Sequence, residues 1–139
     1  MQILVADDHA IIRRRLRQVL EQEFVSATVE EADTGQDAIE AVSKQQWDIV
    51  ILDINLPDKN GIEVLKEMKL LSPSLSVVML TLYPEEQYAV RALKAGALGY
   101  LTKESEQKEL VVAVKKVLSG GVYISPPFGE QLASRLLKG

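Results

Sequence analysis

The stretch that most constrains this chain is residues 49–57, where an apolar run leads into Asp53 and a Leu-Pro pair then ends it. A continuous apolar run of this length is typical of a strand buried on both faces, as in a parallel sheet. In open α/β sheets, ligands bind outside the carboxyl ends of the strands. The sequence therefore predicts that Asp53 lies where such a fold places its ligands.

Four further segments have the character of short strands, and the last of them closes on a lysine: residues 3–6, 27–32, 77–81 and 99–102. Between the strands, apolar residues recur at spacings of three and four, which predicts a helix in each interval. These helices are expected over residues 9–24, in a segment that begins near Ala38, and over residues 62–71, 85–95 and 105–118. Asp8 is placed to cap the first helix. Short connections between alternating strands and helices predict a doubly wound α/β fold. Its five-stranded parallel sheet has the order 2-1-3-4-5 and is flanked by helices.

The end of the chain falls outside this alternation. After two prolines, apolar residues recur at the spacing of an amphipathic helix over residues 128–138: Phe128, Leu132, Leu136 and Leu137. We expect residues 1–121 to form the α/β domain. Residues 122–139 then form a linker with one more helix.

Composition narrows the class of protein. Hydrophobic residues make up 47% and charged residues 26% of 139 residues, as is ordinary for a soluble globular domain. The absence of cysteine excludes disulfides, thiol catalysis and Cys-zinc sites. The acidic start does not fit a signal peptide, and no apolar run approaches the roughly 20 residues that span a bilayer. We expect a cytoplasmic domain without membrane contact, and the net charge of -4 argues against DNA binding by this segment.

Polar side chains follow several of the predicted strands. The carboxyl ends of parallel strands with right-handed crossovers share one edge of the sheet, which brings together Asp7, Asp8, Asp53, Thr81 and Lys103. Crowded carboxylates repel one another unless a cation lies among them. Carboxylate oxygens suit a hard divalent ion, and Mg²⁺ fits because it keeps several waters and takes one or two carboxylates.

Each of these residues also has an ordinary structural interpretation. Asp8 can serve as a helix cap, Asp53 as a strand end, Thr81 as a β-branched strand residue and Lys103 as a solvated charge. Their joint placement, at the ends of different strands, favours the functional interpretation.

Several motifs carry a family resemblance: Val5-Ala6-Asp7-Asp8-His9, Leu52-Asp53-Ile54-Asn55-Leu56-Pro57, Asn60-Gly61, Leu80-Thr81, Lys94-Ala95-Gly96-Ala97 and Gly99-Tyr100-Leu101-Thr102-Lys103. With these motifs the chain resembles a response-regulator receiver domain of two-component signalling, of flavodoxin/CheY-like fold. The linker Gly-Gly-Val-Tyr-Ile-Ser-Pro is similar to that of the NarL/FixJ subfamily, whose output is a LuxR-type helix-turn-helix.

The resemblance implies a role for each carboxylate. Asp53 is implied as the phosphoacceptor, a nucleophile toward a phosphohistidine. Asp8, Asp53 and the backbone carbonyl of Asn55 are implied as direct Mg²⁺ ligands, and Asp7 as a ligand through water.

The resemblance also implies how the phosphoryl group is sensed. Lys103 is implied to pair with the phosphoryl oxygens, and the Thr81 hydroxyl to hydrogen-bond them. Tyr100 is implied to change its rotamer in response, so that Thr81 and Tyr100 form the switch.

The implied partners are a sensor histidine kinase, a second copy of the chain when phosphorylated, and DNA only through an absent C-terminal domain. Such a domain is regulatory rather than an enzyme. A stand-alone receiver that acts through protein docking is the alternative. The basic run of Arg13, Arg14, Arg15 and Arg17 is interpreted as a solvated face or as part of the kinase-docking surface.

Two departures from the family pattern carry expectations of their own. Lys103 is followed by Glu104 rather than by proline, so we expect no cis peptide bond there. Leu82 stands where many relatives have a small residue. We expect its bulk to slow the access of water and small donors to Asp53.

A phosphatase and a flavin-binding module are the alternative functions. A phosphatase with an aspartate nucleophile usually has a second aspartate two residues later, where this chain has Asn55. A flavin-binding module would have a loop rich in Ser, Thr and Gly after the first strand, whereas this chain has Asp-Asp-His-Ala there.

Overall fold

The fold alternates strands and helices along the chain. The computed structural model describes residues 1–105 and 107–138. Its elements are β1 (Gln2–Ala6), α1 (Ala10–Glu23), β2 (Thr28–Ala32), α2 (Gly35–Lys44), β3 (Ile49–Leu52), α3 (Gly61–Leu71), β4 (Val77–Thr81), α4 (Glu85–Lys94), β5 (Gly99–Thr102), α5 (Gln107–Leu118) and α6 (Pro126–Lys138). The strands pair in parallel in the order β2-β1-β3-β4-β5, so the predicted sheet order is confirmed.

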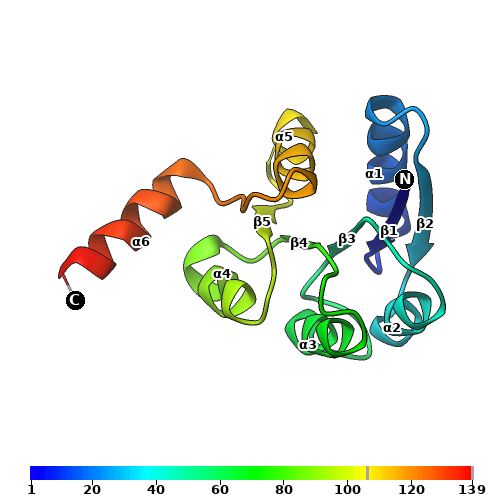
Figure 1. Ribbon diagram of the computed structural model, residues 1–139, viewed down its shortest axis with the longest axis horizontal. Coiled ribbons are helices and arrows are strands. Elements are labelled where there is room, and N and C mark those ends of the chain that lie inside the picture. Colours follow the sequence, from blue (N-terminus) through cyan, green and yellow to red (C-terminus); the bar gives the residue numbers. More distant parts are fainter. Residues whose placement is uncertain (106, 139) are drawn as a thin grey trace.

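The sheet is covered on both faces (Figure 1). Helices α1 and α5 lie on one face, and α2, α3 and α4 lie on the other. Successive residues of β3 point to opposite faces, so Ile49 packs with the α1 and α5 side and Val50 with the α2–α4 side. Every residue of β3 is buried, which explains why its sequence is a continuous apolar run rather than an alternating one.

The start of α1 differs from the prediction. His9, not Asp8, is the N-cap, because the carbonyl of His9 accepts the first helical hydrogen bond, from the Arg13 N–H at 3.0 Å. Among the described residues, no side-chain hydrogen bond caps this helix end, and the predicted capping role of Asp8 is wrong. Asp8 lies one residue too early in the chain, and its carboxylate lies beside the His9 ring instead.

The segment after α5 packs along the sheet. The Tyr123 N–H donates to the Leu98 carbonyl at 2.8 Å, and the Tyr100 N–H donates to the Tyr123 carbonyl at 3.1 Å. These bonds cover part of the free edge of β5, a position that otherwise exposes unpaired backbone groups. The Tyr123 hydroxyl donates to Glu109 of α5 at 2.7 Å. Burial and this carboxylate raise the pKa of Tyr123 to about 12.

The final helix is also tied to the domain. Phe128 in its first turn is 3% exposed and joins the core on the α2–α4 side. The Ser125 hydroxyl donates to Glu85 Oε1 at 2.6 Å and accepts from the Phe128 N–H at 3.3 Å, so it caps α6 and links it to the start of α4. The amphipathic helix predicted over 128–138 is present and begins at Pro126. It extends away from the sheet beyond α4 (Figure 1).

Candidate functional site

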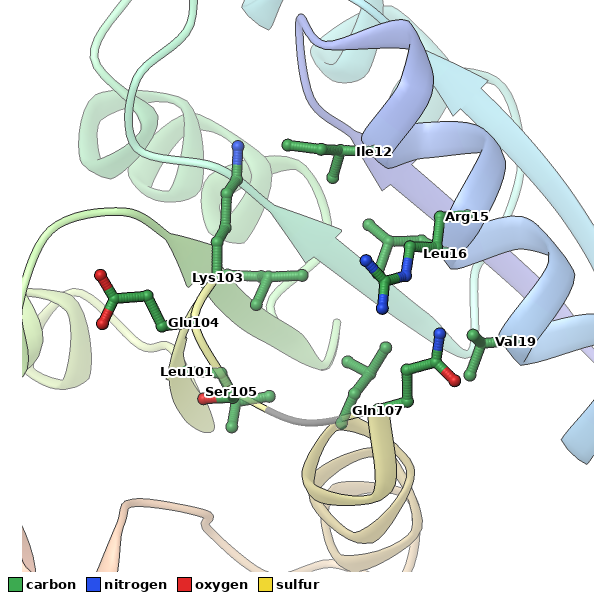
Figure 2. A pocket seen from close by; sticks show the side chains of 11 residues that line it. Ile12, Arg15, Leu16, Val19, Leu101, Lys103, Glu104, Ser105 and Gln107 are labelled. Atoms are coloured by element: carbon green, nitrogen blue, oxygen red, sulfur yellow. The ribbon is translucent and has the colours of Figure 1, made fainter.

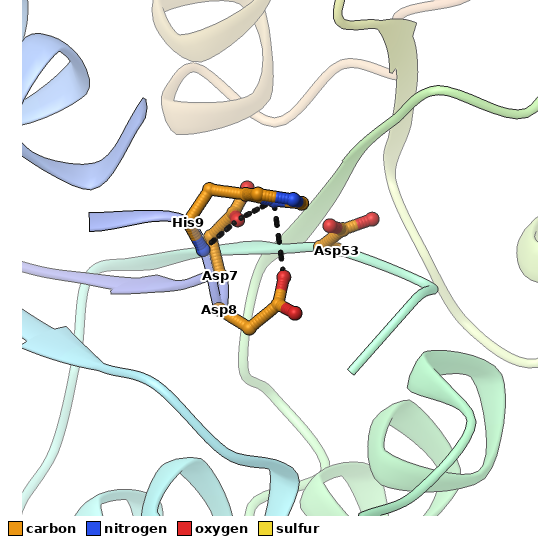
Figure 3. A group of neighbouring side chains, drawn as sticks. All are labelled: Asp7, Asp8, His9 and Asp53. Carbon is orange, nitrogen blue, oxygen red and sulfur yellow. Dashed lines mark hydrogen bonds and ion pairs between the residues drawn. The ribbon is translucent and has the colours of Figure 1, made fainter. Parts of the chain in front are cut away.

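Two buried carboxylates lie at the carboxyl ends of neighbouring strands. β1 and β3 pair with Ala6 opposite Leu52, so the residues that follow, Asp7 and Asp53, emerge side by side. The Asp53 N–H donates to the Ala6 carbonyl at 3.0 Å, which fixes where the Asp53 side chain begins. Ligand atoms of Asp7, Asp8, His9 and Asp53 all lie within 4.8 Å of one another (Figure 3). The structure therefore brings together the carboxylates that the sequence predicted to converge.

Lys103 supplies a cation to this cluster. Its Nζ lies 2.7 Å from Asp7 Oδ2 and 2.8 Å from Asp53 Oδ2, and its side chain is only 6% exposed. Burial acts to lower the pKa of Lys103, but the hydrogen bonds and charges of Asp53 and Asp7 outweigh it and raise that pKa above its ordinary value. The Lys103 N–H donates to the Thr81 carbonyl at 2.7 Å, so the ends of β4 and β5 are joined at the site.

Thr81 has a buried hydroxyl without a partner. Its residue is fully buried, and Oγ1 forms no hydrogen bond with any residue that the structure describes. Buried polar groups are nearly always hydrogen-bonded, so an unpaired hydroxyl at a strand end is a site that can bind a ligand.

Tyr100 is turned into the core. The residue is 1% exposed, and its hydroxyl donates to the Tyr83 carbonyl at 2.9 Å. Burial, followed by the nearby charge of Glu85, raises the pKa of Tyr100. The phenol is therefore neutral and acts as a hydrogen-bond donor to the segment between β4 and α4.

A small cavity opens over Asp53. It has a volume of about 170 Å³ and is lined by His9, Asp53, Asn55, Leu82 and Tyr83. The Asn55 N–H donates to Asp53 Oδ1 at 3.1 Å, while the role of the Asn55 carbonyl stays a prediction. Leu82 is 62% exposed and lines this cavity.

A larger cavity lies between α1 and α5. Its volume is about 370 Å³, and apolar side chains such as Leu16, Leu80 and Leu110 form much of its lining. Arg15 and Gln107 face each other across it, and Lys103 forms part of its wall (Figure 2).

Gly61 allows a close approach beside Asp53. A Cβ atom at this position would lie 2.1 Å from the Asp53 carbonyl oxygen and 2.5 Å from the Ile54 Cα. The Gly61 N–H also donates to the Ile54 carbonyl at 2.7 Å. The start of α3 can therefore pack against the end of the Asp53 segment only if residue 61 lacks a side chain.

Two residues of the site were missed by sequence reasoning. The His9 ring Nδ1 lies 3.1 Å from Asp7 Oδ1 and 3.0 Å from Asp8 Oδ1. Arg13 was interpreted with its basic neighbours as solvated or kinase-docking. Its side chain is only 15% exposed, and its Nη1 donates to the Asp7 carbonyl at 2.5 Å. No sequence signal separates Arg13 from the neighbouring arginines, because its role depends on a side-chain contact with the Asp7 backbone.

The residues present fit a hard divalent cation. Three carboxylates from two neighbouring strand ends offer oxygen ligands, the type that Mg²⁺ prefers.

All peptide bonds of the described residues are trans, as expected with Glu104 after Lys103. No helix in residues 1–105 and 107–138 is long and apolar enough to cross a membrane.

Comparisons with known proteins agree with this geometry. The family model for the response regulator receiver domain matches residues 3–115. The transcriptional regulatory protein DegU of Brevibacillus brevis is 36% identical over 132 residues, which are 95% of this chain and 56% of that protein. The response regulator GacA of Pseudomonas aeruginosa is 32% identical, covering 96% of this chain and 62% of that protein.

A solved structure extends the match to the whole fold. The crystal structure of a LuxR-family two-component response regulator from Aurantimonas sp. SI85-9A1 is 30% identical, with a TM-score of 0.89. The match covers 98% of this chain and 97% of that one. This chain spans 56% and 62% of the length of its curated relatives DegU and GacA. The chain belongs to the receiver domain family of two-component response regulators, and its relatives are regulators of the NarL/FixJ type.

Proposed function

We propose that Asp53 accepts a phosphoryl group from a sensor histidine kinase and that the modified domain then changes conformation. The observation that carries this proposal is the buried hydroxyl of Thr81, at the end of the strand next to that of Asp53, which has no hydrogen-bond partner among the described residues. A phosphoryl group on Asp53 offers acceptor oxygens to that hydroxyl and to Lys103.

The proposed transfer is a displacement at phosphorus. An oxygen of the Asp53 carboxylate forms a bond to phosphorus while the P–N bond of the phosphohistidine breaks, and the electron pair returns to the imidazole of the kinase. Asp8, Asp53 and the Asn55 carbonyl are the proposed ligands of Mg²⁺, with Asp7 acting through water. When bound, the ion neutralises charge on the nucleophile and on the transferring group. The Asn55 N–H holds the Asp53 carboxylate in position through its contact with Oδ1.

Two residues favour storage of the phosphoryl group over rapid turnover. Asn55 occupies the position where aspartate-nucleophile phosphatases carry a general acid, and an amide cannot donate a proton in that way. Leu82 lines the cavity over Asp53, and its bulk is proposed to slow the approach of water to Asp53. The domain is therefore proposed as a regulatory phosphoacceptor rather than an enzyme with turnover.

The proposed response runs through Thr81 and Tyr100. Hydrogen bonding of the phosphoryl group by Thr81 pulls on the segment that follows β4. The carbonyl of Tyr83 in that segment already holds the Tyr100 hydroxyl. A change at Asp53 thus reaches a buried aromatic ring through hydrogen bonds along one short segment.

The proposed partners follow from the relatives. Residues 1–121 are proposed as the receiver and residues 122–139 as a linker whose helix leads toward a helix-turn-helix output domain outside this chain. DegU is named as a transcriptional regulator, and this chain matches 56% of it. DNA contact is proposed only through that output domain, homodimerisation is proposed for the phosphorylated form, and the cytoplasm is the proposed location.

A phosphorylation assay tests the proposal. Incubation with Mg²⁺ and acetyl phosphate should give a hydroxylamine-labile adduct, detected by intact-protein mass spectrometry. Asp53→Asn should abolish the adduct. Asp48→Asn is the matched control, because Asp48 lies at the other end of the same strand, where it accepts the Gln2 N–H at 2.7 Å. An adduct that survives Asp53→Asn, or no adduct at all, would contradict the proposal.

A further inference from the structure

A side chain of α1 reaches the backbone of the acidic cluster. Arg13 Nη1 donates to the Asp7 carbonyl oxygen at 2.5 Å, and Nε of the same guanidinium donates to Glu31 Oε1 of β2 at 3.1 Å. Glu31 Oε2 also lies 3.0 Å from Arg17 Nη1, and Arg17 donates to the Val29 carbonyl. Two arginines of α1 therefore share one carboxylate of β2, but only Arg13 has a bond to the Asp7 backbone among the described contacts.

The position of the Asp7 carbonyl group determines where the backbone of Asp8 lies. The peptide group between these residues is planar, so the position of its oxygen fixes the position of the Asp8 Cα. On the other side of Asp7, the N–H donates to the Ala32 carbonyl at 3.0 Å. The Asp7 backbone is therefore held from both sides, by β2 through its N–H and by Arg13 through its carbonyl.

Asp8 has few contacts of its own that set its direction. Its side chain is 32% exposed, and its carboxylate contacts the His9 ring, which is itself 49% exposed. Asp7 and Asp53, by contrast, are each held by Lys103. The direction of the Asp8 carboxylate therefore depends mainly on the backbone that carries it.

We propose that Arg13 is a positioning residue that holds the peptide between Asp7 and Asp8, so that the Asp8 carboxylate faces the cation site. This inference rests on the proposed Mg²⁺-dependent phosphorylation of Asp53. Residues that hydrogen-bond behind metal ligands orient those ligands, and their loss typically weakens metal binding by about 10–100-fold. Arg13 acts through the backbone rather than through the ligand side chain.

A Mg²⁺ titration of variants tests the inference. Affinity is measured from the amide NMR signals of Asp8 and Asn55 during titration with MgCl₂. Arg13→Gln should weaken Mg²⁺ binding by about tenfold. Arg13→Lys should also weaken it, because lysine keeps the charge but lacks the planar fork that reaches two acceptors at once. Arg17→Gln is the matched control. It removes the same charge beside Glu31 and should leave the affinity within about twofold, because the described contacts of Arg17 are with Glu21, Glu31 and the Val29 carbonyl rather than with Asp7.

A second measurement separates positioning from general destabilisation. In phosphorylation by acetyl phosphate, the Mg²⁺ concentration for half-maximal rate should rise by the same factor in the Arg13 variants. The rate at saturating Mg²⁺ should stay at the wild-type value, because the nucleophile and Lys103 are untouched. A lower rate at saturating Mg²⁺, with an unchanged half-maximal concentration, would contradict the inference.

Other outcomes also decide. Wild-type Mg²⁺ affinity in Arg13→Gln would overturn the inference. Equal weakening of Mg²⁺ binding by Arg17→Gln, or wild-type Mg²⁺ affinity in Arg13→Lys, would also overturn it, because either result would show an effect of charge alone. If Arg13→Gln does not fold, Arg13→Lys and Glu31→Gln carry the test, and normal Mg²⁺ affinity in both would overturn it. A wild-type protein that ignores Mg²⁺ would instead defeat the proposed function, and the inference with it.

Discussion

Replacing Lys103 with methionine in Mg²⁺-free buffer should lower the free energy of unfolding by about 3–5 kcal/mol, the usual loss when one partner of a buried ion pair is removed. The Nζ atom lies 2.7 Å from Asp7 Oδ2 and 2.8 Å from Asp53 Oδ2, and the three side chains are at most 6% exposed. Methionine keeps most of the apolar stem and removes the charge. Two buried carboxylates then lose their shared cation and repel each other, which places the expected loss toward the upper part of the range.

The assay is urea denaturation followed by far-UV circular dichroism, with EDTA present and pH near 7. Adding Asp53→Asn to Lys103→Met removes one of the two unpaired carboxylates and should restore part of the lost stability. Comparison of the double variant with both single variants isolates the coupling between Lys103 and Asp53. A loss below about 1 kcal/mol for Lys103→Met, the range of exposed ion pairs, would refute the reasoning.

The pH dependence of this loss has a definite sign. The pKa of Lys103 is raised in the folded state, so its stabilising contribution is fully present below its ordinary pKa of 10.5 and is lost as pH rises through the folded-state value. The difference in unfolding free energy between wild type and Lys103→Met should therefore be the same at neutral pH and at about pH 9, well below the ordinary lysine value. A difference that shrinks over this interval would show that Lys103 loses its proton early, contrary to the geometry.

Three further changes have distinct expected outcomes. Leu82→Ala should speed the loss of the phosphoryl group from Asp53 severalfold, and equal dephosphorylation rates would count against a shielding role. Gly61→Ala should destabilise the fold by about 3 kcal/mol in urea denaturation, the upper end of the usual cost of overpacking, since its Cβ would meet backbone at 2.1 Å. Gly129→Ala is its control, because that Cβ meets only a side chain at 3.5 Å, and it should be neutral or stabilising. Ser125→Ala removes the cap of α6 and its bond to the first residue of α4, and should cost about 0.5–2 kcal/mol, with faster amide exchange confined to α6.

Residues whose position follows from topology were predictable from the sequence. Asp53 and Lys103 directly follow apolar strands and Thr81 ends one, and parallel pairing alone brings such residues to one edge of the sheet. The prediction needed no knowledge of side-chain geometry. The parallel sheet was predicted from the alternation of strand and helix patterns, and the tail helix from the amphipathic spacing of its own apolar residues.

Residues whose role depends on local geometry could not be predicted. The cap of α1 is His9 rather than Asp8 because a one-residue change in where the helix begins changes which carbonyl starts the hydrogen-bond ladder. Arg13 looks like its exposed basic neighbours in the sequence, and only its rotamer takes it to the Asp7 carbonyl. Phe128 belongs to a recognisable amphipathic helix, but its burial depends on where that helix meets the domain.

The buried hydroxyl of Thr81, which has no hydrogen-bond partner within residues 1–105 and 107–138, indicates how the proposed modification can bias the fold. A buried donor without a partner costs about 1–3 kcal/mol, and a phosphoryl oxygen that accepts its hydrogen bond recovers this free energy only in conformations that bring the two together. The segment that must adjust is short, because Tyr83 holds the Tyr100 hydroxyl and Glu85 holds Ser125 at the start of α6. In the proposed phosphorylated state, a shift of Thr81 therefore reaches the buried Tyr100 ring through Tyr83. It also reaches α6 through Glu85, four residues after Thr81.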